Sequence, residues 1–135
     1  MATPCDARLG LSSALTSQTA PPALRSPDDL SDNDWHKTNP RFTGENFQHN
    51  LCIVDEVVAI ASEAGATPAQ IALAWLLAQG DDIAPIPGTK RVARVEENTA
   101  ADHVVLTANQ IERLNKLTPA AGARHNEGNM AVIDR

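Results

Sequence analysis

Two stretches decide the fold: Gly65-Ala-Thr-Pro-Ala-Gln-Ile-Ala-Leu-Ala-Trp-Leu-Leu-Ala-Gln79 and Ile83-Ala-Pro-Ile-Pro-Gly-Thr-Lys-Arg91. In the first, Thr67 and Gln70 have the spacing of a capping box, which predicts that a helix begins there. The residues that follow are apolar on nearly every side, so this helix needs neighbours all round. The second stretch opens on a short apolar run whose prolines are tolerated at the end of a parallel strand.

A long helix is expected before these stretches. It opens at Thr43-Gly-Glu45, where the acidic residue lies near the positive end of the helix dipole. Apolar residues then recur every three or four positions, which predicts one buried stripe. The stripe consists of Phe47, Leu51, Val54, Val58 and Ala61. Gly65 readily adopts the left-handed backbone conformation in which such a helix ends.

Two further helices are expected after the proline-containing run. One extends from about Val92 to Ala101, and Val104–Leu106 is a brief extended piece after it. A second capping box, Thr107 to Gln110, opens the other helix, which ends before Pro119. Its apolar face consists of Ile111, Leu114 and Leu117. The order helix, helix, strand, helix, helix is typical of the last part of an α/β architecture, although one strand alone makes no sheet.

Length and composition narrow the class of protein. The chain has 135 residues, which suits one domain, and a formal net charge of −6. An acidic chain is a poor partner for nucleic acid or an anionic membrane, and no run approaches the ~18 apolar residues of a membrane span. Cys5 and Cys52 form neither a CxxC motif nor a disulfide framework, so we expect a reduced, cytoplasmic location. The chain contains no tyrosine, which rules out chemistry with a phenol as proton donor.

Three segments are expected along the chain. Residues 1–27 form an irregular N-terminal segment, residues 28–121 carry the α/β elements, and residues 122–135 form a C-terminal tail. The first forty residues hold five of the nine prolines, so this part is not expected to fold alone. We expect no metal site: His49 and Cys52 share a helix face, but two ligands are too few.

The junction Pro87-Gly-Thr-Lys-Arg91 is the candidate binding site. Gly88 allows a ligand to approach the backbone, and the N-terminus of the following helix favours an anion. Lys90, Arg91 and Arg94 add positive charge to this end of an otherwise acidic chain. These features fit a phosphate-bearing nucleotide. A glycine turn with solvated charges would produce the same short motif, and on the motif alone this simpler interpretation is favoured.

Three blocks together supply that context. They are Asn39-Pro-Arg-Phe-Thr-Gly-Glu-Asn-Phe47, Gly65–Gln79, and Pro85-Ile-Pro-Gly-Thr-Lys-Arg91 with Arg94-Val-Glu-Glu-Asn98. In order and spacing they resemble the aldo-keto reductase family, from about Ser26 to Arg135. The resemblance implies the C-terminal portion of a (β/α)8 TIM barrel, incomplete in this chain, since such a barrel needs ~250 residues. It also implies an oxidoreductase that uses NADP(H) on carbonyl substrates.

The resemblance implies a role for six residues. Gly88 and Thr89 contact the adenosine 2′-phosphate and Lys90 supplies a charge to it. Arg94 lies beside the phosphate and stacks on the adenine. Glu97 and Asn98 hydrogen-bond the adenine edge. Leu9 and Gly10 lie near the position of the family's pyrophosphate loop, but the register differs and no role is transferred to them.

The family's catalytic residues have no counterpart here. They are an Asp, a Tyr, a Lys and a His from the first half of the barrel, so no catalytic residue is assigned and the isolated chain is expected to be inactive. A truncated aldo-keto reductase-like protein that retains the 2′-phosphate site is therefore the main interpretation. Two alternatives stay open: a non-catalytic interaction module that docks on another barrel half or on itself, and a truncated product without a function.

Overall fold

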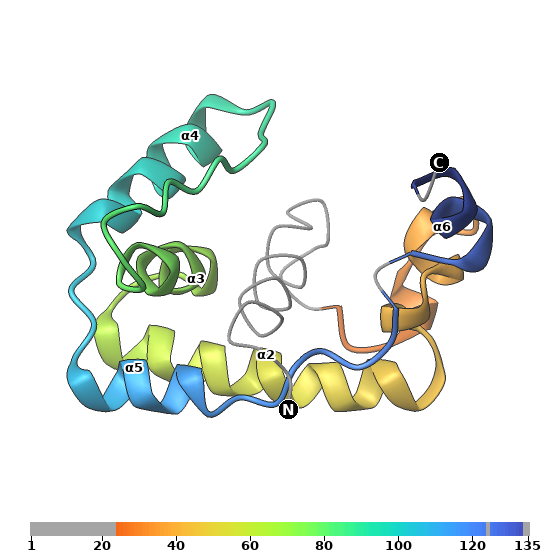
Figure 1. Cartoon of the computed structure of the whole chain (residues 1–135), viewed down its shortest axis with the longest axis horizontal. Helices are drawn as coiled ribbons and strands as arrows, with labels where there is room; N and C mark the ends of the chain where they lie inside the picture. The colour runs from red at the N-terminus through yellow and green to blue at the C-terminus, as the bar shows by residue number, and fades with distance from the viewer. Residues whose placement is uncertain (1–23, 124, 134–135) are drawn as a thin grey trace.

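The computed structural model describes residues 24–123 and 125–133, and the described part is helical (Figure 1). In chain order the elements are the 3-10 turns η1 (Pro27–Asp29), η2 (Trp35–Thr38) and η3 (Pro40–Phe42), then α2 (Gly44–Ala64), α3 (Pro68–Leu77), α4 (Val92–Thr99), η4 (Ala100–His103), α5 (Ala108–Asn115) and α6 (Glu127–Ile133).

Helix α2 is the longest helix of the described chain, and α3, α5 and η3 pack on it. It begins after Thr43, where its start was predicted, and ends at Gly65, whose φ of 65° is the left-handed conformation expected of it. The N–H of Ala66 donates to the carbonyl of Ala61 and closes the last turn. The local signals in the sequence therefore located both ends of this helix correctly.

The predicted stripe on α2 is confirmed at Phe47 and Ala61 and is wrong between them, where Ile53 and Val57 are covered instead of Val54 and Val58. The buried side chains of α2 are Phe47, Ile53, Val57, Ile60 and Ala61. Leu51 and Val54 are only half-buried, and Val58 is 39% exposed, whereas Ile60 is 0% exposed. Two apolar stripes with helical spacing lie side by side on this helix, and the placement of α3 and α5 decides which one is covered.

Helix α3 follows α2 at a bend of 88° and lies between the C-terminal end of α2 and α4 (Figure 1). Its predicted capping box forms: Thr67 N–H donates to Gln70 Oε1 at 3.0 Å, and Gln70 N–H donates to Thr67 Oγ1 at 3.3 Å. The expectation of neighbours all round is confirmed for the middle of the helix, where five consecutive residues from Ile71 to Trp75 are buried. Trp75 also donates from Nε1 to Asn115 Oδ1 at 2.8 Å, which joins α3 to the end of α5.

The remaining helices complete two sides of the core. Helix α4 and the 3-10 turn η4 pack on α3, and α5 packs on α2 (Figure 1). The second predicted capping box also forms, between Thr107 and Gln110. Leu114 is the buried residue of the predicted α5 face, and Leu117 is half-buried against the same core.

Both ends of the described chain carry more structure than was predicted. Residues 24–43 contain the three 3-10 turns, and η3 packs on α2. The region expected as a tail, residues 122–135, contains α6. The segment returns to α2 because Asn50 binds both the N–H and the carbonyl of Ala121. Leu9 and Gly10 lie outside the described residues, as does most of the expected N-terminal segment.

The expected strand at Ile83–Ile86 does not form within residues 24–123 and 125–133. The described residues contain no β-strand, so no neighbouring strand supplies the ladder hydrogen bonds that a strand requires. Burial nevertheless alternates residue by residue from Ile83 to Thr89, as in a half-buried strand. The barrel portion itself is therefore absent from the described structure, although one segment has the pattern of a barrel strand.

Candidate functional site

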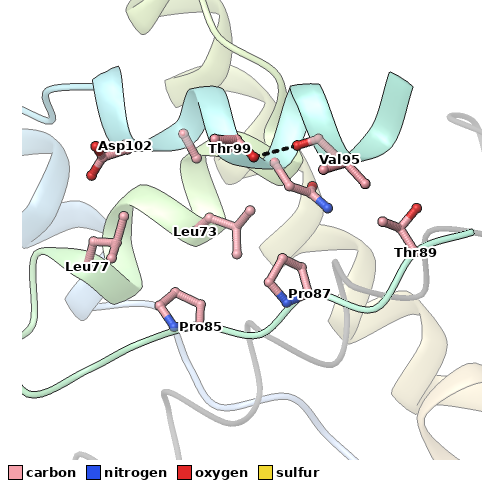
Figure 2. Close-up of a pocket in the computed structure, with 10 residues that line it drawn as sticks. Leu73, Leu77, Pro85, Pro87, Thr89, Val95, Thr99 and Asp102 are labelled. Carbon is pink, nitrogen blue, oxygen red and sulfur yellow. Dashed lines mark hydrogen bonds between the residues drawn. The ribbon is translucent and has the colours of Figure 1, made fainter. Parts of the chain in front are cut away.

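The candidate site lies where the segment 83–89 passes α3 and turns into α4. There it forms a pocket of about 370 Å³ (Figure 2). Figure 2 shows Pro85 and Pro87 on the side of the segment that faces Leu73 and Leu77 of α3. These four side chains form the apolar wall of the pocket.

Helix α4 forms the opposite wall of the pocket. Its contribution comes from Val95, Asn98 and Thr99, with Asp102 from the following turn, a spacing that puts all four on one helical face. Thr99 Oγ1 donates to the carbonyl of Val95 at 2.8 Å within the helix (Figure 2). Thr89 lines the pocket from the loop before α4, so polar side chains lie both before α4 and at its C-terminal end, facing the apolar wall.

The N-terminus of α4 has no side-chain cap, unlike those of α3 and α5. Its N-cap residue is Arg91, whose N–H donates to Thr89 Oγ1 at 3.3 Å. Lys90 and Arg91 are exposed at this end. A helix N-terminus with cations in front of it favours an anion, because the free N–H groups and the dipole both attract negative charge.

Arg94 and Glu97 form an ion pair one turn further along α4, with Nη1 of Arg94 2.5 Å from Oε2 of Glu97. Burial of the Glu97 carboxyl raises its pKa, but hydrogen bonds from Arg94 and Thr67 outweigh burial, so the pKa is below its usual value. Glu97 is therefore ionised at neutral pH and holds the Arg94 guanidinium beside it.

The six predicted site residues extend from the loop before α4 to the last turn of that helix, and they do not all face the pocket. Thr89 and Asn98 line it, and Asn98 is only 8% exposed. Arg94 and Glu97 lie on the neighbouring face of α4, toward the start of α3. Gly88 and Lys90 are exposed, and a Cβ added at Gly88 would meet no atom within 4 Å. The open space at Gly88 fits the predicted approach of a ligand to the backbone.

Sequence reasoning missed the apolar half of the pocket and one polar residue beside it. Leu73 and Leu77 had been assigned to packing alone, and the four-residue spacing that joins them to one face of α3 was visible in the sequence. Gln70 had been assigned to the cap of α3, but its Nε2 also donates to the carbonyl of Glu97 at 3.0 Å. No local pattern indicates that second contact, since it joins residues 27 positions apart.

The other chemistry-bearing residues do not assemble into a second site within the described part of the chain. In residues 24–123 and 125–133, no group of three or more His, Cys, Asp or Glu side chains is placed to hold a metal ion. Cys52 is exposed. His36 and Asp34 form a pair at the start of η2, with 2.5 Å between Nδ1 of His36 and Oδ1 of Asp34.

Among the described helices, no single one is long and apolar enough to cross a membrane. Helices α2 and α3 pass the length and composition test only when taken together, and they are bent by 88° at the break between them.

A glycine and cations precede an uncapped helix here, beside a pocket that is partly apolar. Helix termini with these features are common binding places for phosphate groups. A sequence profile of the aldo/keto reductase family matches residues 11–119. The chain belongs to the aldo/keto reductase family, which confirms the resemblance drawn from the three sequence blocks.

Curated relatives agree with this assignment. An aldo-keto reductase of Schizosaccharomyces pombe, named for NADP(+), is 45% identical over 109 residues, which cover 78% of this chain and 32% of the relative. An aldo-keto reductase of Strobilurus tenacellus is 41% identical over 93 residues, 69% of this chain and 28% of that protein. A probable aldo-keto reductase of Glycine max is 38% identical over 95 residues, which cover 68% of this chain and 28% of that protein. No solved structure matches. The chain thus spans about a third of the length of these relatives.

Proposed function

We propose that this chain binds NADP(H) through the start of α4 and supplies the adenosine 2′-phosphate site of an aldo-keto reductase. The observation that carries the proposal is the uncapped N-terminus of α4, with Lys90 and Arg91 in front of it and a pocket walled by Thr89 and Asn98 beside it. Family membership and the NADP(+) name of one relative support the choice of nucleotide.

The residues present fit that nucleotide in charge and in shape. Helices α3 and α5 satisfy one of their first N–H groups with a threonine cap, whereas α4, like α2, has no side-chain cap, so its first N–H groups can be offered to an external acceptor. A 2′-phosphate at Gly88 and Thr89 would receive backbone N–H groups and the charge of Lys90. Arg94, held by Glu97, would lie beside the phosphate and the adenine, and Asn98 offers an amide to the adenine edge.

Bound NADPH supplies a hydride to a carbonyl carbon in this family's reaction, and a proton donor must complete the reduction. The chain has no tyrosine, and no catalytic Asp, Lys or His is assigned in it. We therefore propose that the chain is a nucleotide-binding part that does not reduce carbonyl compounds alone. Robust NADPH oxidation by the pure 135-residue protein with an aldehyde substrate would contradict this.

The first experiment compares NADPH and NADH binding by calorimetry before and after Lys90→Ala. A charge-assisted hydrogen bond contributes about 1.5–3 kcal/mol, so NADPH binding should weaken about tenfold or more, while NADH, which has no 2′-phosphate, should change little. Lys116→Ala is the matched control, because Lys116 is an exposed lysine of α5 paired with Glu112. An equal loss for the two nucleotides would show that Lys90 supports the fold and does not bind the phosphate.

A second candidate function is docking on another polypeptide, and the exposed side chain of Ile86 favours it. Ile86 is 93% exposed in the segment whose burial alternates like that of a strand. Pro85 and Pro87 lack N–H groups, so only the edge with the N–H groups of residues 84, 86 and 88 can form a full ladder. Ile86→Lys should then raise the dissociation constant of any self-association that light scattering detects. An unchanged dependence of molar mass on concentration would exclude docking through Ile86.

A further inference from the structure

The capping box of α3 is linked to α4, the helix whose N-terminus is the proposed phosphate site. Gln70 uses its Oε1 to accept from Thr67 N–H at 3.0 Å, which is its ordinary role in the box. Its Nε2 donates to the carbonyl of Glu97 at 3.0 Å, across to α4. One half-buried side chain therefore holds the start of one helix and the middle of another at the same time.

The contact with the Glu97 backbone reaches Arg94 through the Glu97 side chain. The Thr67 hydroxyl accepts from Gln70 N–H at 3.3 Å, which completes the box. The Glu97 carboxylate accepts from Arg94 Nη1 at 2.5 Å. Gln70 thus binds the backbone of the residue whose side chain holds the Arg94 guanidinium.

The box at the start of α5 offers a direct comparison. There Gln110 makes the same capping bonds with Thr107, but its Nε2 reaches Glu63 Oε2 of α2 at 3.4 Å. The two boxes are equivalent as caps and differ in the helix that each one holds. Only the α3 box is attached to a candidate ligand-binding residue.

We propose that Gln70 is a positioning residue for the 2′-phosphate site: it holds Glu97, and through Glu97 it fixes the Arg94 guanidinium on the face of α4 next to the pocket. This deepens the proposed function and rests on it. An arginine carries several rotatable bonds, and the entropy of ordering them opposes binding unless the side chain is already held. Gln70 removes part of that cost before the nucleotide arrives.

The test uses Gln70→Glu in the full chain. The carboxylate keeps the acceptor for Thr67 N–H, and Glu is itself a good residue for this position of a capping box. It lacks the donor for the Glu97 carbonyl, so α3 keeps its cap while α4 loses its anchor. Gln110→Glu makes the same chemical change in the α5 box and is the matched control. If Gln70→Glu does not fold, Gln70→Ala removes the donor without adding charge and is measured in its place.

The first readout is the NMR signal of the Arg94 guanidinium protons in the nucleotide-free chain. This signal is assigned to Arg94 because it is absent from the spectrum of Arg94→Lys. Exchange of these protons with water should speed up about 2- to 10-fold in Gln70→Glu, the effect of one lost hydrogen bond, and stay the same in Gln110→Glu. An unchanged signal in Gln70→Glu, equal changes in both variants, or no slowly exchanging Arg94 signal in the parent would each overturn the proposal.

The second readout is the ratio of NADPH to NADH affinity. Gln70→Glu should lower this ratio about 2- to 10-fold because Arg94 is no longer held, whereas a purely structural role would weaken both nucleotides equally and overturn the proposal. The two failures are distinguishable. A parent chain that binds neither nucleotide defeats the proposed function, and the Arg94 signal still decides whether Gln70 holds that side chain.

Discussion

Asn50 joins three segments of the chain, and its replacement offers a sharp test of the fold. Its Nδ2 donates to the carbonyl of Arg41 at 2.9 Å and to that of Ala121 at 3.0 Å, and its Oδ1 accepts from Ala121 N–H at 2.8 Å. Asn50→Leu keeps the approximate size of the side chain and removes all three bonds. Three half-buried backbone groups are then left without this partner.

The expected loss follows from those bonds. A typical intramolecular hydrogen bond contributes about 0.5–1.5 kcal/mol net, so three bonds at a half-buried site should lower the free energy of unfolding by about 2–3 kcal/mol. For a chain of this size the melting temperature should fall by roughly 6–10 °C. Urea and thermal unfolding, monitored by circular dichroism at fixed protein concentration, measure both quantities.

Gln48→Leu is the control, because Gln48 is exposed on the same helix two positions away. It should change the free energy of unfolding by less than about 0.5 kcal/mol. Faster hydrogen exchange near Ala121 in Asn50→Leu would show that the C-terminal segment has been released. If Asn50→Leu and Gln48→Leu are equally stable, the hydrogen bonds between Asn50 and Ala121 do not hold the C-terminal segment on α2.

Two further outcomes test the core and the surface charges. Ile60→Ala should destabilise the chain by about 2–5 kcal/mol and Val58→Ala by less than about 1 kcal/mol, and comparable losses in urea unfolding would contradict the covered face of α2. The pKa of Glu63 is lowered from 4.5, first by its hydrogen bond from Arg113 and then by that from Gln110. Because the folded pKa lies below the unfolded one, this contribution is complete above about pH 4.5 and is lost as pH falls through the folded pKa. The pH dependence of the melting temperature below about pH 4.5 should therefore flatten in Arg113→Gln, whereas an unaltered slope would remove Glu63 as a cause.

Local signals in the sequence determined the helix boundaries and the family. The two capping boxes, the glycine at position 65 and the order of the three sequence blocks each depend on neighbours within a few residues, and the structure and the family match confirm them. The same signals indicated the junction at residues 87–91 as a candidate anion site, and α4 begins directly after it, at Val92, as expected. The roles assigned there to individual residues stay predictions.

Tertiary structure decided everything that depends on which surfaces meet. Two apolar stripes on α2 have equal helical periodicity, so only the positions of α3 and α5 determine that Ile60 is covered and Val58 is not. The segment at Ile83–Ile86 has the alternation of a strand, but a strand forms only when a neighbour completes its hydrogen bonds, and the described residues supply none. The second contact of Gln70 likewise joins groups 27 residues apart, a distance that no local pattern encodes.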